Sequence, residues 1–334
     1  GWSFESVKHD WRKLIENKNN ELDRLNSIYL SILKNNNVDL KEGRGILIDE
    51  HTVEVDGNQI TGENILIAVG GWPSMPDIPG NQYAISSNEA LELPVLPKRM
   101  VIVGGGYIAV EFAGIFSGFG VEVTEIIRAK NILRGFDDDM RTALFEEMEK
   151  RDIKIRAKTE VRAIEKRGAI FSLQLDNDEV IETDCVMYAT GRKANTKELG
   201  LELAGVEMRT NGSIKVDEYN RTSQPHIYAV GDVTDRIQLT PVAIQEGHAL
   251  ADMLFNKNTR TTDYINVPSA VFSTPPIATV GLTEEQARIK FGRIDIYDSN
   301  FKPLVHTISG RDERSVMKLI VEPESDVVVG CHMM

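Results

Sequence analysis

The stretch from Val101 to Asp137, VIVGGGYIAVEFAGIFSGFGVEVTEIIRAKNILRGFD, decides the fold. An apolar strand runs into a glycine turn, and a helix and a second strand follow. Gly104, Gly106 and Ala109 fit the pattern G-x-G-x-x-G/A in the strand–turn–helix context that it requires. The first glycine permits a tight turn, the second lets a pyrophosphate approach the backbone, and the small third residue lets the helix pack closely. The helix N-terminus offers N–H groups to the phosphates, so the stretch predicts dinucleotide binding. A merely tight structural turn is the alternative.

The end of the second strand indicates which dinucleotide is bound. NAD sites usually place an acidic residue there, about 20 residues after the turn, to accept the ribose hydroxyls. Here the strand ends at Ile127 and Arg128, with Arg134 six residues further on, while Glu125 lies within the strand. Guanidinium groups suit a 2′-phosphate because each offers a planar fork of charged donors. The stretch therefore predicts NADPH, and two solvated surface arginines are the alternative.

Strands and helices alternate around this motif, which predicts an α/β fold. Beyond the motif, a helix is expected at 137–151, with strands near 153–156, 161–165, 169–175 and 185–189. Before it, apolar residues at helical spacing predict a long amphipathic helix over 7–34. Short strands are expected at 46–48, 52–55 and 65–69, with Asp56-Gly57 as the turn between the last two.

Towards the C-terminus the expected pattern continues and then changes. A strand at 227–230 precedes a helix at 241–255, and from about Val267 the sequence shows strands and one helix. Thr283 and Gln286 fit a capping box for that helix. The valine run near the end predicts a final strand.

Composition excludes some classes of protein. The net charge of −13 with no basic stretch argues against non-specific nucleic-acid binding. No apolar run approaches the roughly 20 residues of a membrane span, so we expect no membrane partner. Cys185 and Cys331 lie far apart and form no metal-ligand spacing, which indicates buried small side chains, no metal site and a cytoplasmic protein.

Several segments together resemble one family, the pyridine nucleotide–disulfide oxidoreductases, and among them the glutathione reductases most closely. The segments are GGGYIAVEFAGI, IRAKNILRGFD, ATGRKANT, IYAVGDV, LTPVAI and VFSTPPIATVGLTE, in the family's order and spacing. The resemblance implies a homodimer in which NADPH reduces FAD, the flavin reduces a protein disulfide, and the dithiol reduces glutathione disulfide. It also implies Rossmann-like three-layer domains and a partial α+β interface domain. The expected divisions are an FAD-binding domain (1–70 and 195–264), an NADP-binding domain (71–194) and an interface domain (265–334).

The resemblance assigns roles around the glycine turn. Gly104, Gly106, Tyr107 and Ile108 would line the NADPH path, and Tyr107 would cover the nicotinamide pocket. Arg128 and Arg134, already expected at the 2′-phosphate, match family positions. Glu111 would face the flavin and pair with a lysine of the redox-disulfide helix; a carboxylate in so apolar a helix needs a partner if it is buried. An exposed glutamate is the alternative.

Other residues are expected at the flavin. Gly70, Gly191 and Arg192 would lie near the cofactors, and Asp232 would accept the ribityl hydroxyl groups. Thr240 would open a helix whose N-terminal amides face the flavin O2 and stabilise negative charge. Without the resemblance, Thr240 is an ordinary N-cap before a proline.

Two residues are expected near the disulfide substrate. Tyr29 matches a family tyrosine beside the bound disulfide, although a plain core role on its apolar helix stripe is the alternative. His248 stands where many members carry an arginine for a glutathione carboxylate, and it could replace that arginine only weakly or when protonated. Otherwise His248 is a helix-surface residue.

Parts of the family pattern are not found in the printed sequence. These are the glycine-rich turn for the FAD adenosine, the CxxxxC redox disulfide and the terminal His–Glu pair, and neither Cys185 nor Cys331 can replace the disulfide. We therefore expect the chain as written not to reduce a disulfide. Trypanothione and glutathione-amide reductases stay open as alternatives, as does a non-catalytic NADPH-binding fragment. A dihydrolipoamide dehydrogenase is disfavoured because it would want an acidic residue at Ile127.

Overall fold

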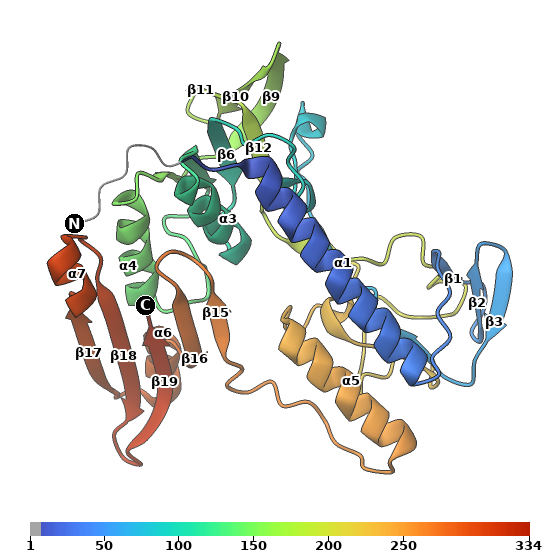
Figure 1. The fold of residues 1–334 in the computed structure, drawn as a ribbon. Coiled ribbons are helices and arrows are strands. Elements are labelled where there is room, and N and C mark those ends of the chain that lie inside the picture. Colours follow the sequence, from blue (N-terminus) through green and yellow to red (C-terminus); the bar gives the residue numbers. More distant parts are fainter. Residues whose placement is uncertain (1–7) are drawn as a thin grey trace. The chain divides into compact units, whose positions relative to one another are not determined.

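The computed structural model describes residues 8–334, which form two compact units (Figure 1). The first unit contains the described residues up to Trp72 together with Arg192–Asp263. The second contains Pro73–Gly191 and Tyr264–Met334. Each unit thus joins two separated stretches of sequence, and the mixture of parallel sheet, helices and antiparallel sheets confirms the expected α/β class.

A parallel four-stranded sheet with the order β12-β6-β7-β8 forms the centre of the second unit. The strands β6 and β12 are apolar and almost wholly buried because such sheets are covered on both faces, whereas the edge strand β8 exposes two charged residues. The helices α3 and α4 connect the strands, and the predicted elements are present to within about two residues. The bounds are β6 Arg99–Val103, α3 Tyr107–Gly118, β7 Glu122–Ile127, α4 Asp138–Glu149, β8 Lys154–Ala157 and β12 Cys185–Tyr188.

A small antiparallel sheet with the order β11-β10-β9 packs its apolar face on the parallel sheet. The strands β9 (Val161–Arg167) and β10 (Ile170–Leu175) were predicted, and β11 (Val180–Thr183) was not, because its short sequence VIET is half polar. Buried residues shared by the two sheets include Val101, Val103, Val161 and Leu173. Short helical turns precede the unit's first strand: η1 Asn81–Tyr83 and α2 Ser87–Ala90.

The C-terminal stretch of the second unit is a five-stranded antiparallel sheet with the order β15-β16-β19-β18-β17. Thr283 and Gln286 form the predicted capping box at the start of α6, and the valine run is the predicted final strand. The bounds are β15 Ser269–Val271, β16 Ile277–Gly281, α6 Glu284–Phe291, β17 Asp295–Phe301, α7 Leu304–Ser309, β18 Ser315–Glu322 and β19 Val327–Met333.

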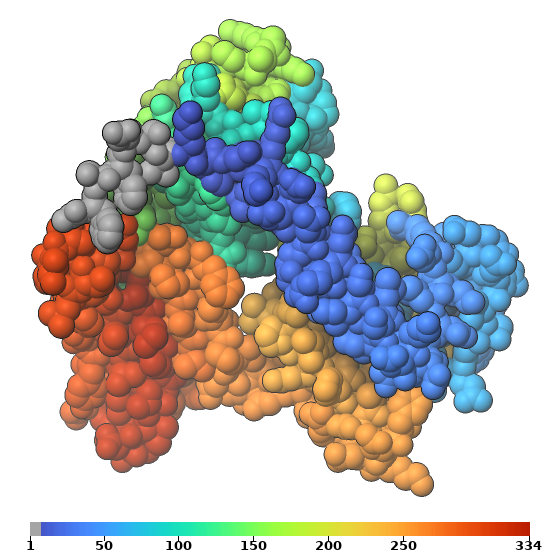
Figure 2. Space-filling view, in the orientation of Figure 1, coloured from blue at the N-terminus to red at the C-terminus, as the bar shows by residue number. Residues whose placement is uncertain are grey.

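The first unit begins with the long helix α1, Trp11–Asn35, where a helix was predicted over 7–34. Position 7 lies outside the described residues. Asp10 caps the helix by accepting a hydrogen bond from the Lys13 N–H at 3.2 Å. None of the residues of α1 is buried, and Figure 2 shows the helix uncovered on the face in view.

The rest of the first unit consists of small sheets around one apolar cluster and a helix, α5, that packs in a second apolar cluster. Asp56-Gly57 is a hairpin turn into a strand that was not predicted, Asn58–Thr61, because NQIT is polar and exposed. The expected placement of this turn before 65–69 was therefore wrong. The bounds are β1 Gly45–Leu47, β2 Thr52–Val55, β3 Asn58–Thr61, β4 Ile65–Ile67, β5 Gly71–Pro73, β13 Arg192–Ala194, β14 Ile227–Ala229, η2 Gly231–Thr234 and α5 Thr240–Phe255.

Candidate functional site

The glycine turn between β6 and α3 is close-packed on its inner side. Gly104 has φ +139°, and a Cβ atom there would lie 2.3 Å from the carbonyl oxygen of Ala189. A Cβ at Gly105 would lie 2.9 Å from the side chain of Ile127. Both positions therefore need glycine for reasons internal to the chain, the first for its conformation and its neighbour, the second for space.

Gly106 differs, because the fold itself does not require glycine there. Its φ of −86° is open to any residue, and a Cβ atom would have no neighbour within 4 Å. It is the N-cap of α3, and no side chain caps the helix there. The free space and the uncapped amides together fit a phosphate group that approaches the backbone. Ala109 and Ala113 are fully buried, so α3 sits close to the sheet.

Two arginines lie on the loop that follows β7. Arg128 and Arg134 are both exposed, and among the described residues neither side chain has a hydrogen-bond or ion-pair partner. The loop itself is fixed to the glycine turn, because the Leu133 N–H donates to the Gly105 carbonyl at 2.6 Å. Arg134 thus directly follows a residue that is bonded to the glycine turn. This arrangement offers two unpaired guanidinium groups to an anion.

Glu125 cannot take the place of the acidic residue of an NAD site. Its side chain is 0% exposed, and burial raises its pKa to about 8. Neither carboxylate oxygen has a hydrogen-bond partner among the described residues. Because the carboxylate points into the core, it offers nothing to a bound ribose.

The structure brings Tyr107, Ile108 and Glu111 together on the first turns of α3. Tyr107 is exposed and Ile108 is half-buried. The carboxylate of Glu111 accepts a hydrogen bond from the Phe272 N–H at 2.8 Å. A backbone amide is therefore the partner that the structure gives this half-buried acid; its expected lysine partner stays a prediction.

In the first unit, Arg192 and Asp232 are neighbours. The Arg192 guanidinium donates to the Gly71 carbonyl and lies 4.0 Å from a carboxylate oxygen of Asp232. Gly70 has φ +69° and open space around its Cβ position, so the chain turns next to this pair. Gly191 has φ +132° and equally open surroundings, but it belongs to the second unit.

Glu246 supports the candidate site, and the sequence analysis missed it. Its buried carboxylate accepts a hydrogen bond from the Gly231 N–H at 2.6 Å and so fixes the turn that carries Asp232. A glutamate within the apolar stretch PVAIQEGHAL was a signal that could have identified it. Thr240 is the first residue of α5 rather than its N-cap, which is Leu239, so the alternative interpretation of Thr240 was wrong. No side chain caps this helix. Pro241 has no N–H and the Val242 N–H donates to the Leu239 carbonyl at 3.0 Å, so the Thr240 N–H is the amide of the first turn that can meet a ligand.

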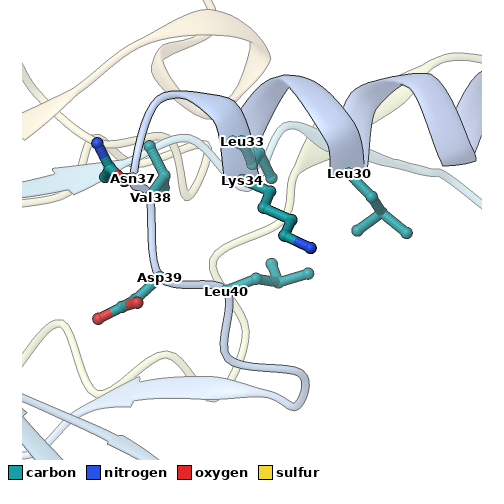
Figure 3. A pocket seen from close by; sticks show the side chains of 7 residues that line it. All are labelled: Leu30, Leu33, Lys34, Asn37, Val38, Asp39 and Leu40. Carbon is teal, nitrogen blue, oxygen red and sulfur yellow. The ribbon is translucent and has the colours of Figure 1, made fainter.

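The two expected substrate residues lie on helix surfaces. Tyr29 is 65% exposed, so its alternative role in the core is wrong. His248 is exposed on α5. A hollow of about 310 Å³ lies at the C-terminal end of α1, where Leu30 and Leu40 face the same space (Figure 3). None of the predicted site residues lines it. Its lining consists of Leu30, Leu33, Lys34, Asn37, Val38, Asp39 and Leu40.

The two cysteines are free thiols. Burial, with a smaller effect of Asp184, raises the pKa of the Cys185 thiol to about 12, which disfavours the thiolate that redox chemistry needs. Within residues 8–334 no group of three His, Cys, Asp or Glu side chains is arranged so that it could hold a metal ion. Over the same residues, no helix is long and apolar enough to cross a membrane.

Comparison with known proteins identifies the family. Residues 3–247 match the model of the pyridine nucleotide-disulphide oxidoreductases, and residues 267–334 match the dimerisation domain of that family. The chain belongs to this family. The resemblance seen in the sequence motifs is thereby confirmed.

Sequence alignments with relatives from this family extend over the whole chain. It is 52% identical to a chloroplastic/mitochondrial glutathione reductase of Pisum sativum and spans 61% of that protein's length. It is 46% identical to a glutathione reductase of Burkholderia cepacia and spans 74% of it. Among solved structures, the chain is similar to the HOCl-induced flavoprotein disulfide reductase RclA from Escherichia coli, with a TM-score of 0.91 and 30% sequence identity. The match covers 97% of this chain and 76% of the RclA chain.

Proposed function

We propose that the chain is the NADPH-binding part of a flavoprotein disulfide reductase that reduces glutathione disulfide. The observation that carries the nucleotide assignment is the open Gly106 turn beside the two unpartnered arginines on the β7–α4 loop. The substrate assignment rests on the glutathione reductases that match the whole chain at 46–52% identity. A related disulfide reductase of the trypanothione or glutathione-amide type is the alternative within the family.

In this proposal NADPH lies along the turn, with its pyrophosphate at the uncapped N-terminus of α3. Gly104 holds the turn, Gly106 leaves room for the phosphates, and Tyr107 and Ile108 border the path to the nicotinamide. Arg128 and Arg134 bind the 2′-phosphate through charge-assisted hydrogen bonds. Bound FAD would accept a hydride from NADPH and pass two electrons to a disulfide.

Two of the residues proposed at the flavin, Asp232 and Arg192, are held by contacts within the chain. The Asp232 carboxylate, fixed through Gly231 and Glu246, would accept ribityl hydroxyl groups, and Arg192, Gly191 and Gly70 would lie near the cofactors. The first amide of α5, at Thr240, would stabilise negative charge on the flavin. Glu111 would orient the nicotinamide side of the flavin. Tyr29 and His248 would contact the disulfide substrate. The protein would form a homodimer through residues 267–334 and would be located in the cytoplasm.

The first experiment tests the cofactor. NADPH and NADH are titrated against the purified chain and against Arg128→Gln, Arg134→Gln and the double variant. Each lost contact to a charged group is worth about 1.5–3 kcal/mol, so NADPH affinity should fall at least tenfold while NADH affinity is unchanged. Arg167→Gln removes the same charge from an exposed hairpin and is the matched control. Equal losses for the two nucleotides would refute the 2′-phosphate role.

The second experiment separates the reductase from a non-catalytic nucleotide-binding protein. A yellow protein with a flavin spectrum that bleaches when NADPH is added supports the flavoprotein assignment. A colourless protein that still binds NADPH after incubation with FAD supports the non-catalytic alternative. In a protein that carries the family's redox disulfide together with this sequence, oxidation of NADPH in the presence of glutathione disulfide, compared with trypanothione disulfide and lipoamide, then identifies the substrate.

A further inference from the structure

A buried lysine of the C-terminal sheet lies at the start of α4. Lys318, on β18, is 2% exposed, and its ammonium group contacts three carboxylates. The distances are 3.0 Å to Asp137, 2.5 Å to Asp139 and 2.6 Å to Glu284. Glu284 also pairs with Arg288 at 2.7 Å. Two cations and three anions thus form one cluster that joins α4, α6 and the sheet.

Asp137 is the centre of this cluster because it caps two helices. One carboxylate oxygen accepts the Asp139 N–H at the start of α4 at 3.2 Å, and the other accepts the Glu284 N–H at the start of α6 at 2.9 Å. A carboxylate at a helix N-terminus is stabilised by the helix dipole, and here two helices act on the same group. The position of Asp137 is therefore fixed from the C-terminal sheet as well as from its own helix.

The loop with the two arginines ends at this point. Leu133, with φ +49°, donates its N–H to the glycine turn, and Asp137 is held by Lys318 four residues later. Arg134 is the first residue between these two anchors. The guanidinium of Arg141 strengthens the first anchor, because it donates to the Ile132 carbonyl at 2.7 Å.

We propose that Lys318 is a positioning residue for nucleotide recognition: through Asp137, it holds the loop so that Arg134 meets the 2′-phosphate of NADPH. The preference for NADPH over NADH would then depend on a residue of the dimerisation domain that does not touch the nucleotide. This inference rests on the proposed NADPH function and adds a specificity-determining residue to it. If the ion pair between Lys318 and Asp137 is lost, Arg134 is still present on the loop, but its position is no longer fixed.

The test is the affinity of Lys318→Met for NADPH and NADH, measured by titration of the purified chain. We expect NADPH affinity to fall about tenfold and NADH affinity to change less than twofold. In an Arg134→Gln background, Lys318→Met should cause little further loss of NADPH affinity, because both changes remove the same contact. Additive losses in the double variant, or equal losses for both nucleotides, would overturn the proposal.

A matched control uses a second ion pair that joins the other end of α4 to the C-terminal stretch, Arg151–Glu313. Arg151→Gln should leave the ratio of NADPH to NADH affinity unchanged. If Lys318→Met does not fold, Asp137→Asn removes the charge that pairs with Lys318 while the lysine stays, and an unchanged ratio in that variant would also refute the proposal. A wild-type chain without NADPH preference would contradict the proposed function itself, whereas a preference that needs Arg134 but not Lys318 would contradict only this inference.

Discussion

Glu125 and Asp137 are two buried carboxylates of one unit, twelve residues apart in the sequence, and their surroundings are opposite. Glu125 lies in the middle of β7 without a hydrogen-bond partner among the described residues, and burial raises its pKa to about 8. Asp137 is also buried, which by itself would raise its pKa. The Glu284 N–H and Lys318 act against burial, and the net pKa of Asp137 is lowered.

The comparison shows that burial alone does not decide the charge of a carboxylate; the partners do. A buried charge is expensive unless hydrogen bonds and an opposite charge replace its water. Asp137 lies at the N-termini of two helices and next to the ammonium group of Lys318, so it stays ionised. The sheet pairs Glu125 with Ile102 and Ile155, and its carboxylate has no hydrogen-bond partner among the described residues, so Glu125 favours its neutral form.

The largest expected effect is the loss of the ammonium group at Asp137. Lys318→Met leaves Asp137 buried without a cation, and removing one partner of a buried ion pair costs about 3–5 kcal/mol. Urea unfolding at pH 7 should show a midpoint well below that of wild type. A loss under 1 kcal/mol would mean that water reaches Asp137 and that the two carboxylates are less different than their burial indicates.

Glu125→Leu should change stability in the opposite direction. With an ordinary pKa of 4.5 unfolded and about 8 folded, the variant should gain on the order of 3 kcal/mol at pH 7. Between these two values the native state binds more protons than the unfolded state, so wild-type stability falls as pH rises through this window. The variant should lack that slope, and its advantage should shrink towards pH 4.5.

Glu122→Leu is the control for this substitution. Glu122 lies on the same strand but is exposed, so its replacement should change stability by less than about 0.5 kcal/mol at any pH. The measurement is the free energy of unfolding of the wild type and of both variants at pH 5, 7 and 8.5. A wild-type stability that does not fall over this range would show that Glu125 finds a partner in solution.

The glycine turn was predictable because it is local. Gly104, Gly106 and the following helix lie within one short stretch, and each glycine has a position-specific reason that sequence alone expresses. The position of Arg128 and Arg134 on the loop after the second strand was predicted from the same stretch. The strands and helices around it were predicted for the same reason, since apolar periodicity over 98–192 directly reflects burial.

What the sequence could not show is contact between distant residues. Lys318 meets Asp137 across 181 residues, and a lysine in the alternating strand SVMKLIVE reads as a surface residue. Glu125 was recognised as part of the strand, but only the packed structure shows that both faces of the strand are covered there. The short polar strand Asn58–Thr61 was missed because edge pairing of exposed residues leaves no apolar pattern.

A smaller effect is expected when the charge of Asp137 is removed but its shape is kept. Asp137→Asn keeps an oxygen that can accept one backbone N–H and loses the charge-assisted bonds, each worth about 1.5–3 kcal/mol. Because the folded pKa of Asp137 is lowered, its stabilisation is present above the unfolded pKa and is lost as pH falls through the folded value. The variant should therefore lose less stability than wild type on acidification, as unfolding midpoints at pH 3 and pH 6 would show. An identical acid response would assign that loss to other carboxylates.

The smallest effect concerns a third buried carboxylate, Glu147, whose cation lies at the surface. Its partner Lys150, at 2.8 Å, is 34% exposed at the side chain. Water can replace an exposed ammonium group, so Lys150→Gln should cost only about 0.5–1 kcal/mol, as for other surface pairs. The same urea unfolding that shows a large loss for Lys318→Met would show this small one. If the two losses were equally small, the cation would contribute little at either site, and the difference between Glu125 and Asp137 would have to come from the helix N-termini.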